Sequence, residues 1–259
     1  MAKAVIITGG GSGIGKSLGR YFAARGWNVC IADIVEERVK ETASEITPEG
    51  IAVLAIRVDT RVLSEVKAMM SICLKNFRRI DALVNNAGIT DKKHREILDL
   101  PYEMWNEVLS VNLTGSFICL KEYCSIMKKQ GGGNVVNITS PLGHSGHARS
   151  GDTVYGVSKA ALESLTEYAS VEMKEFGINI NSAYPDVMVN TDFFSYLAED
   201  ARKELASPSI LNELVYVLCN LKPGELTGRF YCAEDWKQDP VLEKVYRLYF
   251  GGSEGEGTI

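Results

Sequence analysis

The sequence predicts an α/β fold built on a doubly wound, mostly parallel β-sheet with helices on both faces. Short apolar runs alternate with amphipathic stretches along most of the chain. The apolar runs are continuous, which is typical of strands buried on both faces. A glycine-rich turn at 9–15 joins the first apolar run to the first amphipathic stretch. These observations indicate a Rossmann-like sheet, in which ligands bind beyond the carboxyl ends of the strands.

The elements follow in a regular order. Apolar runs predict strands at 4–8, 28–32, 51–58, 80–86, 134–139 and 178–181. Helical periodicity predicts helices from about residue 13 and around 35–46, 62–77, 102–129 and 153–176. A last strand lies within "GRFYCAEDW", and "DPVLEKVYRLYFG" then forms an amphipathic helix. We expect residues 1–250 to form a single domain and the glycine-rich end, 251–259, to be a flexible tail.

Composition narrows the classes of function. The 259 residues are 46% hydrophobic and carry a net charge of −5, with scattered basic residues, so nucleic acid is not expected as a partner. No apolar run approaches the roughly 18 residues of a membrane span, and the chain enters a strand at once without a signal peptide. We therefore expect no membrane association and a cytoplasmic location. The six cysteines lack metal-ligand spacing and are expected to be reduced core residues.

The stretch "ITGGGSGIGKS" fits two kinds of phosphate site. As Gly10-x-x-x-x-Gly15-Lys16-Ser17 it matches the P-loop of nucleoside triphosphate enzymes. As a turn between a strand and a helix it suits the pyrophosphate of a dinucleotide. Asp33 ends the second strand, where a carboxylate suits the ribose hydroxyls of NAD. Asp33 therefore favours the dinucleotide.

Further motifs follow in order. They are Thr8-Gly9-x-x-x-Gly13-x-Gly15, "NNAG" at 85–88, "VNLTG" at 111–115, "TSPLG" at 139–143 and "YGVSK" at 155–159. With them the chain resembles the short-chain dehydrogenase/reductase family, in its compact single-domain form, over roughly residues 1–192. The resemblance implies a nicotinamide-dependent oxidoreductase.

Four residues are the expected catalytic group. Tyr155 and Lys159 are four apart on a helix and share a face. An ammonium beside the phenol lowers its pKa, which makes Tyr155 a general acid/base. Ser140 ends the fifth strand, where its hydroxyl can bind the substrate oxygen. By resemblance, Lys159 also binds the nicotinamide ribose, and Asn112 is the helix-breaking residue that holds a water of the proton relay.

The resemblance also implies the residues that bind NAD. Ile14 meets the pyrophosphate through its backbone, Asp59 contacts adenine, Val189 binds the carboxamide and Thr191 lies near the pyrophosphate. The expected cofactor-binding residues are Gly9, Ser12, Gly13, Ile14, Gly15, Asp33, Asp59, Asn86, Ala87, Gly88, Tyr155, Lys159, Pro185, Val189 and Thr191. Asp33, with no basic residue directly after it, predicts NAD(H) over NADP(H).

The chain departs from the family in the substrate region. Asp186 follows Pro185 where the family usually has glycine. The stretch between Ser140 and Tyr155 is longer than expected and carries His144, His147 and Arg149. A histidine pair can suggest a metal, but no third ligand accompanies it, so we expect no metal and interpret the loop as polar or substrate-facing.

The sequence thus predicts an NAD-dependent enzyme that interconverts a secondary alcohol and a ketone. Three alternatives stay open: an NADPH-dependent 3-oxoacyl-(acyl-carrier-protein) reductase, a non-catalytic dinucleotide sensor and, more remotely, a P-loop phosphotransferase. A homo-oligomer, by resemblance a tetramer, is expected because 111–127 is apolar on almost every side.

The C-terminal helix is expected to present one apolar stripe of Val241, Leu242, Val245, Leu248 and Tyr249. One interpretation packs it near the cleft of its own or a neighbouring subunit. It would then enclose a small to medium polar substrate within reach of His144 and His147. The other interpretation has it support a subunit interface.

Overall fold

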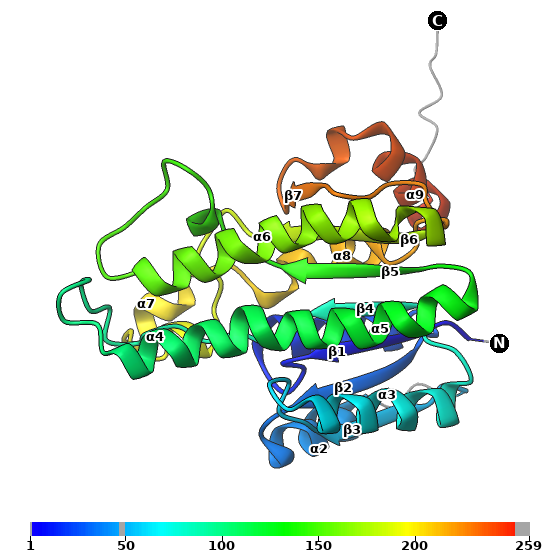
Figure 1. Cartoon of the computed structure of the whole chain (residues 1–259), viewed down its shortest axis with the longest axis horizontal. Helices are drawn as coiled ribbons and strands as arrows, with labels where there is room; N and C mark the ends of the chain where they lie inside the picture. The colour runs from blue at the N-terminus through cyan, green and yellow to red at the C-terminus, as the bar shows by residue number, and fades with distance from the viewer. Residues whose placement is uncertain (1, 47–49, 252–259) are drawn as a thin grey trace, which may run out of the picture.

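Seven parallel strands form one sheet in the computed structural model, which describes residues 2–46 and 50–251 (Figure 1). Their order is β3-β2-β1-β4-β5-β6-β7. The strands are β1 (Ala4–Thr8), β2 (Asn28–Asp33), β3 (Val53–Arg57), β4 (Ala82–Asn85), β5 (Gly133–Ile138), β6 (Ile178–Tyr184) and β7 (Phe230–Cys232). The predicted α/β fold with a doubly wound parallel sheet is confirmed.

Helices cover both faces of this sheet. The helices are α1 (Gly13–Ala23), α2 (Glu36–Glu45), α3 (Leu63–Phe77), α4 (Tyr102–Leu109), α5 (Ser116–Gln130), α6 (Thr153–Met173), α7 (Glu199–Lys203), α8 (Asn212–Leu218) and α9 (Pro240–Phe250). Figure 1 shows α3, α5 and α6 in front of the sheet. Helices α1, α2, α8 and α9 pack on the opposite face. Among the described helices, none is long and apolar enough to cross a membrane.

Strand β1 shows why the strands are continuously apolar. All five of its residues are buried. Val5 and Ile7 belong to the cluster under α1 and α8, whereas Ala4 and Ile6 belong to the cluster under α3 and α5. Because side chains alternate along a strand, a strand covered on both faces favours apolar residues at every position, as β1 shows.

The order of the strands positions the site. The chain runs outward from β1 to β3 and then returns to continue on the other side of β1 with β4. The crevice at such a reversal, beyond the carboxyl ends of the strands, is where dinucleotides bind. The glycine turn after β1 and the "NNAG" segment at the end of β4 both lie there.

The long helix expected at 102–129 is interrupted. A π-helical turn, Ser110–Gly115, separates α4 from α5. The side chain of Asn112 in this turn binds the backbone of Ile89 in both directions, at 2.8 Å and 2.9 Å. Local widening of a helix of this kind is frequent at functional sites.

The predicted C-terminal helix is present as α9, but its expected apolar stripe is partly wrong. Leu242 and Val245 are buried, whereas Leu248 is 71% exposed and Tyr249 is 44% exposed. Tyr246 and Phe250 pack against the core in their place. The expected tail lies outside the described residues, apart from residue 251.

Helix α9 also lies far from the cleft of its own subunit. Tyr249 stands beside Lys3, which precedes β1, so this end of α9 is at the amino edge of the sheet (Figure 1). Tyr249 and Phe250 pack on Tyr216 of α8. The expectation that α9 roofs its own cleft is therefore wrong, because its apolar residues are buried on α8 instead.

Candidate active site

Glycines let the turn after β1 fold tightly against β4. Gly9 and Gly13 have positive φ angles of 63° and 50°, which disfavour any residue with a side chain. A Cβ on Gly15 would lie 2.2 Å from the carbonyl oxygen of Gly9. Ser12 is the extended residue directly before α1, and its side chain makes no capping bond. The turn thus leaves backbone N–H groups exposed at the start of α1.

The first turn of α1 is suited to an anion. The N–H of Lys16 is the first bonded within the helix, to the carbonyl of Ser12, so the N–H groups of Ile14 and Gly15 have no intrahelical acceptor. Such groups and the helix dipole attract phosphate. The ammonium of Lys16 points elsewhere, to Glu41 at 3.3 Å and Glu45 at 3.0 Å on α2. This placement agrees with the dinucleotide interpretation rather than the P-loop one.

Asp33 is oriented by two backbone amides at the end of β2. Its carboxylate accepts from the N–H of Gly11 and of Val35, each at 3.1 Å. These bonds hold the carboxylate beside the glycine turn, where the resemblance places the adenosine ribose.

Asn86, Ala87 and Gly88 connect the glycine turn to the catalytic group. Asn86 donates its side-chain amide to the carbonyls of Thr8 and Gly9, at 2.9 Å and 3.1 Å. The N–H of Ala87 donates to the Thr8 hydroxyl at 3.1 Å. A Cβ on Gly88 would lie 3.3 Å from the Asn112 amide oxygen and 3.6 Å from Lys159 Nζ. Gly88 therefore leaves open the space between the expected cofactor and catalytic residues.

Asp59 follows β3, near the outer edge of the sheet. Its carboxylate is paired with the guanidinium of Arg61 at 2.7 Å, and this bond lowers the pKa of Asp59. The expected adenine contact thus comes from a carboxylate that already has a fixed partner.

The backbone after β6 offers a matched donor and acceptor. Pro185 follows β6, and Val189 then forms a parallel bridge with Ala206. This bridge uses the carbonyl of Met188 and the N–H of Asn190. Among the described backbone groups, the N–H and C=O of Val189 have no backbone partner. An amide such as a carboxamide requires one donor and one acceptor.

Thr191 closes over the glycine turn. Its Cγ2 lies 2.9 Å from the position that a Cβ on Gly13 would occupy. The segment after β6 therefore touches the turn after β1, as expected for a residue near a pyrophosphate.

Ser140, Tyr155 and Lys159 meet between β5 and α6. Ser140 lies two residues after the end of β5, is 8% exposed, and accepts the N–H of Leu142 at 3.2 Å. Lys159 Nζ lies 5.6 Å from the centre of the Tyr155 ring and donates to the carbonyl of Ile138 at 2.8 Å. The three side chains therefore share one site, with Tyr155 and Lys159 on one face of α6.

Burial has the largest effect on the pKa values of Tyr155 and Lys159. It raises the pKa of Tyr155, which the hydrogen bond from Ser140 opposes and the charge of Asp152 reinforces. Burial lowers the pKa of Lys159 to about 8, against the influence of Glu163. In this structure the Lys159 ammonium is directed at Ile138 and not at the phenol. The lower pKa of Tyr155 expected from Lys159 stays a prediction for the cofactor-bound protein.

Asn112 is completely buried below this group. Besides its bonds to Ile89, its amide donates to the Ser158 hydroxyl at 2.9 Å on α6. Its own carbonyl accepts the hydroxyl of Ser116 at 2.8 Å. Asn112 thus joins the β4 loop, the π-helical turn and the catalytic helix.

The residues that depart from the family pattern lie in two clusters, one in the loop after β5 and one after β6. His144 Nε2 lies 2.8 Å from Glu163 Oε1, and its ring packs on Tyr184. His147 is exposed, with its ring centre 6.0 Å from that of His144. His144 is therefore occupied by Glu163 rather than poised with His147 for a metal.

Asp186 lies in the second cluster. Its carboxylate, the thiol of Cys232 and the carboxylate of Glu234 lie within 4.8 Å of one another. Asp186 and Glu234 are exposed, whereas Cys232 is buried. The expected absence of a metal stays a prediction.

Several residues at the site were not found from the sequence. Phe193 packs on the ring of Tyr155 with centroids 5.6 Å apart. Arg38 of α2 lies against Gly11 and pairs with Asp192 at 2.9 Å. His94, after β4, lies 3.0 Å from Asp152 at the start of α6. None of these residues belongs to a motif. The sequence offered two weak indications: Arg38 lies five residues after Asp33, and Asp152, the partner of His94, lies three residues before Tyr155.

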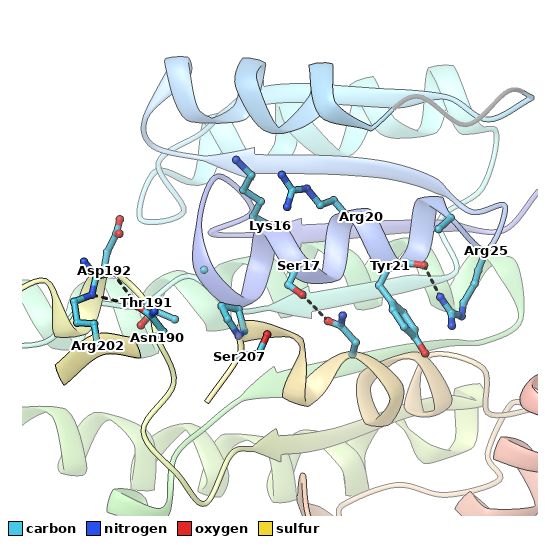
Figure 2. A pocket seen from close by; sticks show the side chains of 14 residues that line it. Lys16, Ser17, Arg20, Tyr21, Arg25, Asn190, Thr191, Asp192, Arg202 and Ser207 are labelled. Carbon is cyan, nitrogen blue, oxygen red and sulfur yellow. Dashed lines mark hydrogen bonds between the residues drawn. The ribbon is translucent and has the colours of Figure 1, made fainter. Parts of the chain in front are cut away.

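A groove of about 500 Å³ lies beside this site (Figure 2). It runs along α1 and the residues just after it, from Gly13 to Arg25, and is bordered on its other side by the segment 190–212, in which Arg202 donates to Asn190. Ser17 and Asn212 join across it at 3.1 Å. The groove excludes Tyr155 and Ser140, so it is separate from the catalytic group.

Comparison with known proteins agrees with this geometry. A family model described as short chain dehydrogenase matches residues 3–202. The chain therefore belongs to the short-chain dehydrogenase/reductase family and is an oxidoreductase.

Relatives with different activities are similarly close. An uncharacterized oxidoreductase of Thermotoga maritima is 40% identical over 71% of this chain and 70% of its own. The 3-oxoacyl-[acyl-carrier-protein] reductase FabG of Staphylococcus epidermidis is 31% identical over 79% of this chain and 82% of its own. The 7alpha-hydroxysteroid dehydrogenase of Bacteroides fragilis is 33% identical over 78% and 77%.

Solved structures share the fold. A short-chain type dehydrogenase/reductase from Mycobacterium marinum superposes with a TM-score of 0.81 at 29% identity, covering 89% of this chain and 93% of that one. A tyrosine-to-phenylalanine variant of ElxO with NADPH bound gives a TM-score of 0.78 at 28% identity, covering 90% and 97%.

Proposed function

We propose that this protein is an NAD-dependent dehydrogenase that interconverts a secondary alcohol and a ketone. The observation that carries the proposal is the meeting of Ser140, Tyr155 and Lys159 next to the space left by Gly88. An acid/base, a hydroxyl donor and an ammonium thus border the expected nicotinamide site.

Three features of the chain support binding of a nicotinamide dinucleotide. The exposed N–H groups at the start of α1 suit the pyrophosphate, Asp33 suits the adenosine ribose, and the unpaired backbone of Val189 suits the carboxamide. The bound nicotinamide supplies the hydride acceptor or donor. We place Lys159 against its ribose hydroxyls.

The chain's own residues move the proton. During oxidation, the Tyr155 phenolate removes the hydroxyl proton of the alcohol as hydride leaves the adjacent carbon. Ser140 donates a hydrogen bond to the same oxygen and stabilises the charge that develops there. In the reverse direction, the Tyr155 phenol protonates the carbonyl oxygen. Phe193 packs on the Tyr155 ring, and the buried Asn112 binds Ser158 on the same helix, so both support the position of this group.

The preference for NAD rests on Asp33, while Arg38 favours the opposite choice. A 2′-phosphate would meet the Asp33 carboxylate at close range, and like charges disfavour it by a few kcal/mol at most. Arg38 lies beside Asp33, but its guanidinium is paired with Asp192. We infer that this pairing keeps Arg38 from compensating Asp33.

The cofactor choice is tested by catalytic efficiency with NADH and NADPH in three proteins. We expect the native chain to favour NADH, Asp33→Ser to narrow the preference, and Arg38→Ala to leave NADH efficiency nearly unchanged. Comparable efficiency with both cofactors in the native chain would contradict the preference for NAD, and loss of NADPH efficiency alone in Arg38→Ala would show that Arg38 binds the 2′-phosphate.

The reaction class is tested by NADH absorbance on a panel of secondary alcohols, sugars, hydroxyacids and 3-oxoacyl thioesters. The reductase relatives make the thioesters a necessary arm. We expect turnover on alcohols or ketones that lack a thioester. Turnover on thioesters alone would favour an acyl-carrier-protein reductase. NADH quenching of tryptophan fluorescence without turnover on any compound would favour a sensor.

A further inference from the structure

A short segment after β6, residues 192–196, contacts Arg38, Tyr155 and His94. In this segment, 192–196, Asp192 pairs with Arg38 at 2.9 Å and Phe193 packs on Tyr155. Tyr196 packs on the ring of His94 with centroids 5.0 Å apart. One five-residue segment therefore contacts both Tyr155 and His94. Burial raises the pKa of the Tyr155 phenol, and Asp152, which pairs with His94, is close enough to Tyr155 for its charge to raise that pKa further.

One ring nitrogen of His94 has a hydrogen-bond partner, and the other has none among the described residues. Its Nδ1 lies 3.0 Å from the carboxylate of Asp152, three residues before Tyr155. Because a carboxylate only accepts, Nδ1 carries a proton, and in the neutral ring Nε2 is then an acceptor. Nε2 is buried and has no hydrogen-bond partner among the residues that the structure describes. A buried polar atom without a partner is costly, so a group that binds it gains free energy.

The backbone is also arranged around His94. Its φ angle is 47°, and the only other described non-glycine residue with positive φ, Arg78, ends a helix. The buried carboxylate of Asp91 accepts the N–H groups of Lys93 and Arg95 on either side. A Cβ on Gly151 would lie 2.4 Å from the His94 carbonyl, so the loop is pressed against the start of α6. The loop holds this one side chain toward the catalytic helix.

The geometry points to His94 as a specificity-determining residue that binds a second hydroxyl of the substrate. This inference rests on the proposed function, because it concerns a molecule whose first carbinol is oxidised at Tyr155. A hydroxyl donates to Nε2 of the neutral ring and accepts from it when the ring is protonated, so it suits both states. The favoured substrate class is therefore diols, polyols and hydroxy ketones rather than simple secondary alcohols.

Two variants separate binding by Nε2 from a structural role. His94→Asn tolerates positive φ and keeps an amide where Nδ1 bonds Asp152, but has nothing at the position of Nε2. His94→Gln extends an amide to about the position of Nε2 and gives up the bond to Asp152. Lys93→Ala, at an exposed neighbour in the same loop, is the matched control.

The test compares kcat/KM for 2-butanol with 2,3-butanediol and for 2-hexanol with 2,5-hexanediol. In the native chain and in Lys93→Ala we expect at least one diol to be favoured about tenfold beyond the twofold statistical advantage of two carbinols. In His94→Asn the preference should fall to about twofold, mainly through KM, and in His94→Gln part of it should remain.

Three results would contradict the inference. A native chain that oxidises the mono-alcohols but favours neither diol would show that no second hydroxyl is bound. A preference kept in His94→Asn but lost in His94→Gln would show that only the bond to Asp152 matters. Absence of turnover on all four compounds and on the wider panel would instead contradict the proposed function, and this inference with it.

Discussion

Burial disfavours the charged form of the Lys159 side chain. Burial lowers its pKa from 10.5 to about 8, so the unfolded chain binds more protons between these two values. The native stability contributed by this group is therefore fully present above pH 10.5 and is lost as the pH falls through about 8. Comparison with Lys159→Met isolates this effect, because the opposite contribution of Tyr155 is common to both proteins.

We expect the stability of the native chain, relative to Lys159→Met, to increase by roughly 2–3 kcal/mol between pH 7 and pH 10. The measurement is urea unfolding of both proteins without cofactor at several pH values. A difference that does not change with pH would contradict the burial of a charged ammonium at this position.

Gly15 tests the glycine turn by itself. An alanine there would place its Cβ 2.2 Å from the Gly9 oxygen, so the turn must open. We expect Gly15→Ala to weaken NADH binding at least tenfold by fluorescence titration. Gly26→Ala is the control, since its φ is 78° but its Cβ would meet nothing within 4 Å. Equal NADH affinity in both variants would contradict the proposed phosphate site.

Among individual residues, the sequence predicted the catalytic group better than the residues that contact it. Ser140, Tyr155 and Lys159 lie in motifs at the ends of elements, and the parallel sheet brings such ends to one edge. Arg38, His94 and Phe193 reach the site from loops and helix faces, where no local pattern encodes the long-range contact. The loop that carries His144 was interpreted as polar or substrate-facing, and the contact of His144 with Glu163, nineteen residues later, was not predicted.

At the scale of elements, α9 is a support for α8. Leu242 is fully buried there, whereas Leu248 on the same helix is 71% exposed. We expect Leu242→Ala to cost about 2–4 kcal/mol in unfolding free energy with no change in KM, and Leu248→Ala to cost less than about 0.5 kcal/mol. A raised KM in Leu242→Ala without loss of stability would revive a role at a cleft. Packing on a neighbouring subunit's cleft stays a prediction.

Most elements were predictable because their apolar patterns are long and regular. The expected and observed strands agree to within a few residues, since continuous apolar runs suit a sheet with two covered faces. The π-helical turn at Ser110–Gly115 did not follow from helical periodicity, although the family resemblance implied that Asn112 breaks the helix. In this turn Asn112 binds Ile89 in the loop after β4, and helical periodicity does not predict a bond to a distant loop.

For the whole molecule, we propose a homotetramer. The subunit contact is now expected to include α6 as well as the segment 111–127 that the sequence suggested. Along α5 the large exposed apolar residue is Phe117. On the neighbouring α6, Tyr168 is 70% exposed and Val171 is 73% exposed, one turn apart. An exposed apolar stripe on adjacent helices is suited to a symmetric partner.

We expect light scattering at micromolar concentration to give the mass of a tetramer for the native chain. Tyr168→Glu combined with Val171→Glu should give a smaller species, because both charges would be buried in the contact. Leu248→Glu, on the exposed side of α9, is the control and should keep the native mass. A monomeric native chain would refute the proposal.

The proposed reaction is tested most directly at Tyr155. The measurement is the turnover of Tyr155→Phe with NAD and the best alcohol of the panel, together with its affinity for NADH. The substitution removes the proton-transferring hydroxyl and leaves the glycine turn and Asp33 untouched. We predict that kcat falls roughly 10²-fold or more while NADH binds with nearly native affinity. Near-native turnover in Tyr155→Phe would contradict the assignment of Tyr155 as the acid/base.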